Sequence, residues 1–334
     1  MKKILIIQTA SIGDVILSTA LAEKLHDYYP EAEIDFLVKT GMESLFSGHP
    51  FIKNILVWNK KKDKYLNLYK ILVRVRNNQY DAVINVQRFI STGIIAGLSG
   101  AKLRAGFDKN PFSFLFNIRI KHLIGQESLG LHETDRNQKL IASFTDTKAS
   151  RPELYPEPRD FEAVSRYKSS PYVCIAPASL WNTKQFPAEK WIELIQKLPS
   201  ELVVYLLGSP TDSVLCKRIQ KESSNANVHD LSGSLILLQS AALIKDAKMN
   251  YVNDSAPMHI ASAMNAPVTA IFCSTVPEFG FGPLSERSAI VQTELALSCR
   301  PCGIHGFNTC PEKHFKCAQT ILIKSLLNTL NERK

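Results

Sequence analysis

The sequence predicts an α/β protein built from two doubly wound units, each with a parallel sheet. Short apolar runs alternate with helical patterns, and this alternation predicts parallel strands covered by helices on both faces. It stops in a proline-containing stretch near the middle of the chain and then starts again. A length of 334 residues and a hydrophobic content of 45% fit two globular domains of about 150 residues each.

The first half carries the first run of alternating elements. The opening MKKILIIQ is predicted to be a buried strand rather than a secretory leader, because its aliphatic run ends at Gln8. No apolar stretch approaches the roughly 18–20 residues of a membrane span, so we expect a cytoplasmic protein or one peripheral to a membrane. The patterns predict strands at 3–8, 33–38, 80–87 and 102–107, and helices at 14–29 and 65–77.

Residues 148–170 contain several prolines and few aliphatic side chains, which is typical of a linker. Beyond it the alternation resumes and predicts a second parallel sheet, with ligands at the carboxyl ends of its strands. Strands are predicted at 172–177, 202–207, 249–252 and 268–273, and helices at 187–198, 210–221, 235–245 and 257–264.

The net charge is +9, and most of it falls in residues 1–150. A basic surface attracts phosphates of nucleic acids, anionic lipids or glycans, and it also serves simply to keep a protein soluble. A zinc-bearing nucleic-acid-binding protein is the alternative hypothesis from a different functional class than an enzyme. We expect no nucleic acid partner, because the cysteine-rich segment lies at the other end of the chain from the charge and no recognition motif accompanies it.

Asp14 lies where the first predicted strand passes into a helix. The turn QTASIGDVILSTAL has a lone Gly13 in place of the three-glycine dinucleotide fingerprint, which argues against a nicotinamide dehydrogenase. At this position the carboxylate of Asp14 could act as a general base or could cap the helix. The residues alone leave both roles open.

Two segments of the second half suit a phosphate group. In NDSAPMHIASAMNAP a strand passes into a helix with Pro257 in its first turn, so free amides can meet an anion. His259 could donate to a phosphate there or pack in the core. In APASLWNTKQFPAEKW, Ser179 and Lys184 suit a diphosphate or belong to a polar loop, and Asp212 in LLGSPTD suits a ribose or a helix cap.

The segments IGDVILSTAL, KQFPAEKW and NDSAPMHIASAMNAP together resemble glycosyltransferase family 9, the lipopolysaccharide ADP-heptose heptosyltransferases. YDAVINVQ, RAGFD and HETDRN extend the resemblance over most of the chain. It implies a GT-B fold, with two Rossmann-like domains facing a central cleft. The acceptor would bind to residues 1–155 and the nucleotide sugar to residues 165–317, while a C-terminal helix in 318–334 would cross back onto the first domain.

The resemblance also implies inverting transfer of heptose from ADP-heptose to a lipopolysaccharide core or lipid A acceptor, at the inner face of the cytoplasmic membrane. Asp14 would be the general base. The donor would contact Ser179, Lys184, Asp212, Leu235, Asp254, Ser255, Ala256 and His259. Basic residues near the family-like segments would hold the acceptor, namely Arg88, Arg104, Arg136 and His132. The chain has no Asp-x-Asp pair, so we expect metal-independent transfer without a cofactor, and peripheral contact with an anionic membrane.

Two positions depart from the family pattern. Ala256 stands where relatives have glycine, and Leu180 replaces a second hydroxyl. A Cβ atom at position 256 restricts the approach of a phosphate to the backbone. Another nucleotide sugar, or a non-catalytic relative that binds a nucleotide or a glycan, therefore remains an alternative.

Four cysteines near the C-terminus follow the pattern C-x2-C-x7-C-x6-C, with histidines nearby. Four thiolates can bind structural zinc in a reducing compartment, although the spacing matches no standard zinc ribbon. The alternative interpretations are that these cysteines form disulfides or remain free thiols. The four residues are Cys299, Cys302, Cys310 and Cys317.

Overall fold

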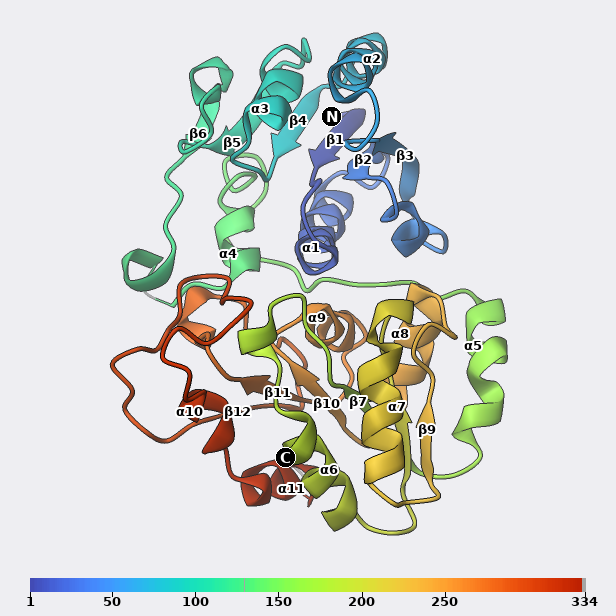
Figure 1. Cartoon of the computed structure of the whole chain (residues 1–334). Coiled ribbons are helices and arrows are strands. Elements are labelled where there is room, and N and C mark those ends of the chain that lie inside the picture. The colour runs from blue at the N-terminus through green and yellow to red at the C-terminus, as the bar shows by residue number, and fades with distance from the viewer. Residues whose placement is uncertain (129, 332–334) are drawn as a thin grey trace. The chain divides into compact units, whose positions relative to one another are not determined.

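A computed structural model describes residues 1–128 and 130–331 of the chain (Figure 1). The chain divides into two compact units, Met1–Tyr155 and Pro156–Lys334. Each unit contains a six-stranded sheet in which all strands run parallel. The predicted pair of doubly wound α/β units is thereby confirmed.

The first unit has the strand order β3-β2-β1-β4-β5-β6. Its strands are β1 (Lys3–Ile7), β2 (Glu33–Lys39), β3 (Ile52–Trp58), β4 (Ala82–Asn85), β5 (Leu103–Phe107) and β6 (Ile118–Ile120). Its helices are α1 (Ile12–Tyr28), α2 (Lys64–Asn77), α3 (Ile90–Gly97) and α4 (Glu133–Gln138).

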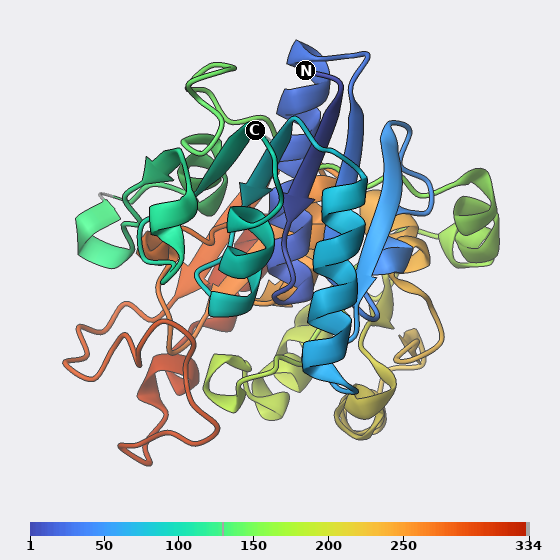
Figure 2. The same ribbon diagram turned by 90° about the horizontal axis from the view of Figure 1, so that it is seen from above.

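Helices cover both faces of this sheet, because successive parallel strands are joined by crossovers. Figure 2 shows α2 and α3 side by side on one face, where they contact each other, and α1 contacts α4. Leu5 and Ile7 of β1 pack in one core cluster with Ile71 and Val75 of α2. The buried central strand β1 thus anchors the layer that carries α2.

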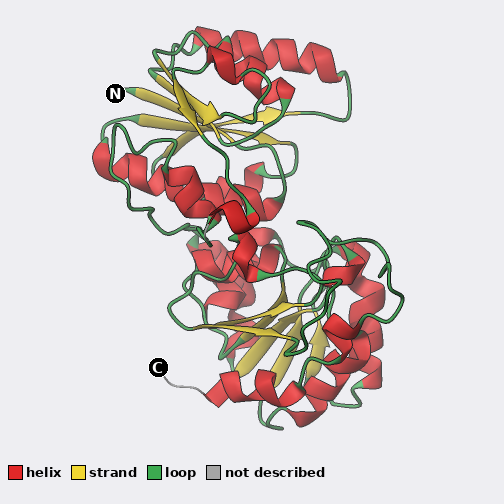
Figure 3. Ribbon diagram, turned by 90° about the vertical axis from the view of Figure 1, so that its left-hand side faces the viewer, coloured by secondary structure: helices red, strands yellow, loops and turns green. Residues whose placement is uncertain are grey.

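The second unit has the strand order β12-β11-β10-β7-β8-β9. Its strands are β7 (Tyr172–Ala176), β8 (Val203–Leu206), β9 (Val228–Asp230), β10 (Asn250–Asn253), β11 (Val268–Phe272) and β12 (Ser288–Gln292). Its helices are α5 (Pro158–Val164), α6 (Ala188–Lys197), α7 (Ser213–Glu222), α8 (Leu237–Lys245), α9 (Ala256–Ala263), α10 (Lys316–Gln319) and α11 (Ile323–Asn331). Helices again lie on both faces of the sheet (Figure 3).

One segment differs from the sequence prediction. The expected linker 148–170 contains α5, which starts at Pro158 because proline is favourable at the first helical position.

The last helix, α11, contributes to the core of the second unit. Its Ile323 and Leu326 lie in one hydrophobic cluster with Trp191 of α6, and the two helices are in contact.

The strand orders locate a switch point in each sheet. Chain connections leave in opposite directions from β1 and β4 in the first unit and from β7 and β10 in the second. In such sheets the connecting loops part at these carboxyl ends and leave a crevice where ligands bind. Among the described residues no helix is long and apolar enough to cross a membrane.

Candidate functional site

Asp14 lies in the first turn of α1, directly after β1 and its switch point. Its Oδ2 accepts hydrogen bonds from the Ser11 amide at 3.1 Å and from the Ser11 hydroxyl at 2.6 Å. Ser11 in turn caps the helix, so the two residues form a capping box. No described residue donates a hydrogen bond to Oδ1. The local pattern fixes the carboxylate in orientation and leaves one oxygen available.

A buried ion pair from α4 lies close to Asp14, since α4 packs against α1. Arg136 donates to Glu133 Oε2 from Nε at 2.9 Å and from Nη2 at 2.7 Å. Burial raises the pKa of Glu133, and the charge of Asp14 adds to the rise, while Arg136 and Arg88 oppose it. Arg88 follows the carboxyl end of β4 and is exposed. The first unit therefore brings together three of the candidate residues, Asp14, Arg88 and Arg136, with Glu133, which the sequence did not single out.

Two histidines complete this region. Burial, together with Arg88, Arg136 and Lys109, lowers the pKa of His122 to about 4. His132 is the N-cap of α4 and accepts a hydrogen bond from the Thr134 amide through Nδ1. We call Asp14, Arg88, His122, Glu133 and Arg136 the first-unit site.

Arg104, by contrast, does not join the first-unit site. It lies near the amino end of β5, where its guanidinium donates to the carbonyl groups of Leu115 and Ala101. Asp14 follows the carboxyl end of the neighbouring strands. The sequence placed Arg104 near family-like residues, but the direction of β5 carries it to the opposite edge of the sheet.

A second missed group lies at the carboxyl ends of β1, β3 and β4. Lys60 Nζ donates to Thr9 Oγ1 at 2.7 Å, and that hydroxyl donates to Gln87 Oε1 at 2.5 Å. Burial, with the charges of Lys39 and Lys64, lowers the pKa of Lys60 to about 8. These residues place a cation at the same edge of the sheet as Asp14.

In the second unit, Lys184 and Asp254 form a buried ion pair at the β7/β10 switch point. Lys184 Nζ lies 2.6 Å from Asp254 Oδ2, and Thr275 Oγ1 donates to the same oxygen at 2.7 Å. Lys184 comes from the loop after β7, Asp254 follows β10, and Thr275 follows β11. Three neighbouring strand ends thus converge on one carboxylate. We call Lys184, Asp254, Ser255 and Thr275 the second-unit site.

Polar bonds hold the loop of Lys184 in place. Asn253 Oδ1 accepts from the Phe186 amide at 2.9 Å, and Asn253 Nδ2 donates to the Pro177 carbonyl at 2.8 Å. Thr183 Oγ1 accepts from Ser274 Oγ at 3.0 Å and from the Phe307 amide at 2.8 Å. The loop is therefore tied both to β10 and to the cysteine-rich segment.

The N-terminus of α9 adjoins this ion pair. Ser255 is its N-cap in extended backbone, and no side chain among the described residues caps the first turn. Amides at an uncapped N-terminus can bind an anion, and the helix dipole favours one. Ala256 and Pro257 occupy the first two positions of α9. His259 is the fourth residue of this helix and is buried.

The other predicted donor residues lie in separate loops. Asp212 Oδ2 accepts from the amide and the hydroxyl of Ser209, both at 2.7 Å, in a capping box. Leu235 is half-buried in the loop before α8, and Ser179 is half-buried in the loop after β7. Ser179 is joined to the Lys184 loop by a hydrogen bond from Gln185 Nε2 to its carbonyl. The structure thus shows a capping role for Asp212.

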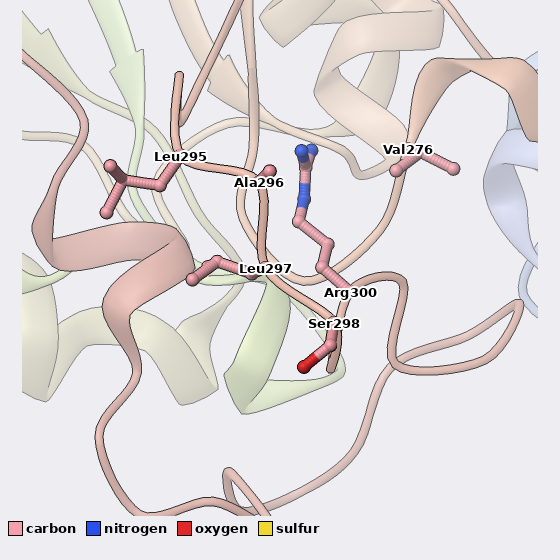
Figure 4. Close-up of a pocket in the computed structure, with 6 residues that line it drawn as sticks. All are labelled: Val276, Leu295, Ala296, Leu297, Ser298 and Arg300. Carbon is pink, nitrogen blue, oxygen red and sulfur yellow. The ribbon is translucent and has the colours of Figure 1, made fainter.

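A pocket of about 520 Å³ opens beyond the ends of β11 and β12 (Figure 4). The Arg300 side chain extends between Val276 and the segment 295–297. Its guanidinium donates to the carbonyl groups of Cys273 and Thr275. Burial lowers the pKa of Arg300 from its ordinary value. Through Thr275 the pocket adjoins the second-unit site, and no pattern in the sequence predicted this pocket.

The four C-terminal cysteines lie in one region. Burial raises the pKa of Cys302, with Cys299 and Cys310 adding to the rise, and burial raises the pKa of Cys317 to about 11. Cys299 Sγ lies 4.0 Å from His314 Nε2. Within the described residues, no three His, Cys, Asp or Glu side chains are arranged to hold one metal ion. Structural zinc stays a prediction.

The sequence model of Glycosyltransferase family 9 (heptosyltransferase) matches residues 68–308, more than half of the chain. The chain belongs to glycosyltransferase family 9. Lipopolysaccharide heptosyltransferase 1 of Campylobacter coli is 23% identical to it over 297 residues, which cover 82% of this chain and 84% of the relative.

Solved structures show the same fold for this family 9 member. The structure of E. coli ADP-heptose lps heptosyltransferase II aligns with a TM-score of 0.79 at 21% identity, covering 99% of this chain and 98% of the other. E. coli heptosyltransferase WaaC with ADP-2-deoxy-2-fluoro heptose aligns with a TM-score of 0.72 at 18% identity, covering 98% and 99%. The predicted family, glycosyltransferase class and GT-B fold are confirmed.

Proposed function

We propose that this glycosyltransferase moves heptose from ADP-heptose to the lipopolysaccharide core or lipid A, with inversion at the anomeric carbon. The observation that carries the proposal is the second-unit site. In a family 9 chain, a buried Lys184–Asp254 pair and an uncapped helix N-terminus meet at the sheet's switch point. That combination suits a nucleoside diphosphate, because it offers a cation and backbone amides to one anion.

On the donor side, Asp254 and Thr275 position Lys184. The Thr275 hydroxyl donates to the Asp254 carboxylate, and this carboxylate in turn holds the ammonium group of Lys184. As the bond between the anomeric carbon and ADP breaks, negative charge grows on the diphosphate. Lys184 and the amides of Ser255 and Ala256 stabilise that charge, and they are already in place before the reaction begins.

On the acceptor side, Asp14 is the general base. Ser11 holds Oδ2, so Oδ1 is the oxygen that takes the proton from the acceptor hydroxyl. As it loses this proton, the acceptor oxygen forms a bond to the anomeric carbon on the face opposite the departing ADP, which inverts the configuration. Arg88 and Arg136 bring positive charge to the same site and favour an acidic acceptor. His132 is a further acceptor contact in this proposal, whereas Arg104 lies elsewhere.

The same proposal includes transfer without a metal ion, since Lys184 and helix amides take the charge-stabilising role. It also places the enzyme in the cytoplasm, at the inner face of the membrane where a lipid-linked acceptor would be found. Support for the glycolipid acceptor comes from the relatives, which are lipopolysaccharide heptosyltransferases.

The test measures ADP release and glycolipid product from ADP-heptose and truncated lipopolysaccharide acceptors in the presence of EDTA. We expect coupled formation of ADP and product. Binding of ADP-heptose without transfer to any acceptor would contradict the proposed acceptor class. Transfer only from another nucleotide sugar would contradict the donor, and Ala256→Gly is then the variant to compare, because Ala256 places a Cβ atom beside the proposed diphosphate.

A further inference from the structure

Helix α2 carries an apolar stripe that the first unit leaves exposed. Tyr65, Tyr69 and Leu66 are 80%, 65% and 53% exposed, and Val73 is 37% exposed. We call these four residues the α2 patch. Apolar and aromatic side chains of this size are normally buried when they lie together on a helix. We therefore expect the α2 patch to contact a binding partner.

The stripe is a second apolar face of the same helix. Ile71 and Val75 are four residues apart and pack into the core of the first unit. Tyr65, Tyr69 and Val73 are also spaced by four, so they share another face. An ordinary surface helix has one apolar face and one polar face. The first face already anchors α2, so the second is not needed for folding.

The charge around the α2 patch is strongly positive. Between residues 60 and 76 the chain has seven Lys or Arg residues and a single acidic residue, Asp63. Of the residues that the structure describes, no carboxylate forms an ion pair with any of the seven. Lys64 Nζ lies 5.8 Å from the centre of the Tyr65 ring, so cation and aromatic ring stand side by side.

The helix is held firmly in its layer. Arg76 Nη1 donates to the carbonyl of Leu98 at the end of α3, at 3.0 Å. Figure 2 shows α2, in light blue, beside α3 on the same face of the sheet. Because α2 is already folded and packed, its side chains can be presented without the cost of ordering a disordered segment on binding.

We propose that the α2 patch is a docking surface for an anionic lipid bilayer, which its tyrosines enter at the headgroup level while the surrounding Lys and Arg residues contact lipid phosphates. Tyrosine has an apolar ring and a polar hydroxyl, which suits the membrane interface. A helix with an apolar stripe and basic flanks lies in the plane of such an interface. An acidic protein would match the charge, but it would not require tyrosines and aliphatic residues along one open stripe.

The test is co-sedimentation of the full chain with vesicles of phosphatidylcholine alone and of an equimolar mixture with phosphatidylglycerol. We expect binding to the mixed vesicles only, weakened when salt rises from about 0.1 M to about 1 M, because screening shortens the Debye length from about 10 Å to about 3 Å. Lys64→Gln/Lys70→Gln/Arg74→Gln should lower the partition coefficient about 100-fold. Tyr65→Ser/Tyr69→Ser should lower it about tenfold.

Val214→Ser/Lys217→Gln on α7 is the matched control, because it removes an exposed apolar residue and an exposed lysine from another helix. It should bind as the native chain does, and thermal unfolding should be unchanged in all three variants. Equal loss in the control, no binding by the native chain, or tighter binding to a single-stranded oligonucleotide than to the mixed vesicles would overturn the proposal. ADP-heptose binding measured on the same variants should not change, so this proposal and the proposed function can fail separately.

Discussion

Asp14 and Asp212 have the same local structure in two different regions of the molecule. Each is the last residue of a Ser-x-x-Asp capping box, in which its Oδ2 accepts from the amide and the hydroxyl of the serine. Their surroundings differ. Asp14 follows the central strand β1 at the switch point and lies near the buried Glu133, whereas Asp212 follows β8, beyond the switch point of its sheet.

This comparison teaches that a capping pattern alone does not identify a base. Both carboxylates are oriented by the same bonds to serine, so orientation cannot separate them. The strand order does, because of these two loops the one after β1 opens at a switch point and the one after β8 does not. Comparing Asp14 with Asp212 tests whether position in the sheet, rather than the local motif, decides what such side chains do, and three further predictions test the surroundings of the two sites.

The largest effect is expected for Asp14→Asn. Asparagine still accepts from Ser11 but cannot take a proton from the acceptor, so kcat should fall about 1,000-fold. Asp212→Asn makes the same chemical change in the second capping box, and its kcat should stay within about threefold of native. Initial rates of ADP release measure both. Equal losses in the two variants would break the comparison, and ADP-heptose affinity of Asp14→Asn serves as the control for folding.

The next largest effect is expected when the ion pair of the second-unit site is broken. There the Asp254 carboxylate is paired with Lys184. Lys184→Gln leaves Asp254 buried without its cation, which should lower the free energy of unfolding by about 3 kcal/mol. It should also weaken ADP binding about 100-fold if Lys184 meets the diphosphate. Lys184→Gln/Asp254→Asn should regain most of the stability but not the ADP affinity. Urea unfolding and titration calorimetry separate the two, and native ADP affinity in the double variant would remove Lys184 from the donor site.

The sequence could predict elements and local motifs but not what distant segments bring together. Buried runs such as 3–8 and 268–273 predicted β1 and β11, because strands buried on both faces are continuously apolar. The position of Asp14 was likewise predictable, since a strand, a serine and a helix follow in order. Glu133 beside it was not, because α4 meets α1 only through tertiary packing. For the same reason the sequence did not predict that the Thr275 hydroxyl donates a hydrogen bond to Asp254.

Arg104 shows the limit of reading proximity along the chain. It stands near family-like residues in sequence, yet it lies at the amino end of β5 and bonds to carbonyl groups there. A parallel strand separates its two ends by its full length, so residues a few positions apart can lie at opposite edges of a sheet.

A pH effect is expected in the first-unit site, whose buried histidine is surrounded by Arg88, Arg136 and Lys109, with Asp108 opposing them. The pKa of His122 is lowered to about 4, so the folded chain binds this proton less tightly than the unfolded chain. Stability is therefore full above about pH 6.5 and falls as pH drops toward 4, by about 3 kcal/mol. His122→Gln should flatten that part of the curve in urea unfolding. An unchanged slope would show that other groups cause the acid sensitivity.

The smallest effect is a difference in ADP affinity between alanine variants of two glycines, Gly303 and Gly306. Both lie in the cysteine-rich segment that adjoins the second-unit site. Gly303 and Gly306 both have positive φ, at +68° and +77°, so alanine at either should cost about 1 kcal/mol in strain. A Cβ at Gly303 meets no described atom within 4 Å, whereas one at Gly306 would lie 2.8 Å from Thr183 Oγ1 and 3.2 Å from Lys184 Cγ. Gly306→Ala should therefore also weaken ADP binding, by about tenfold, because it displaces the lysine that Asp254 positions. Equal ADP affinities in the two variants would mean that the segment only covers the site and does not shape it.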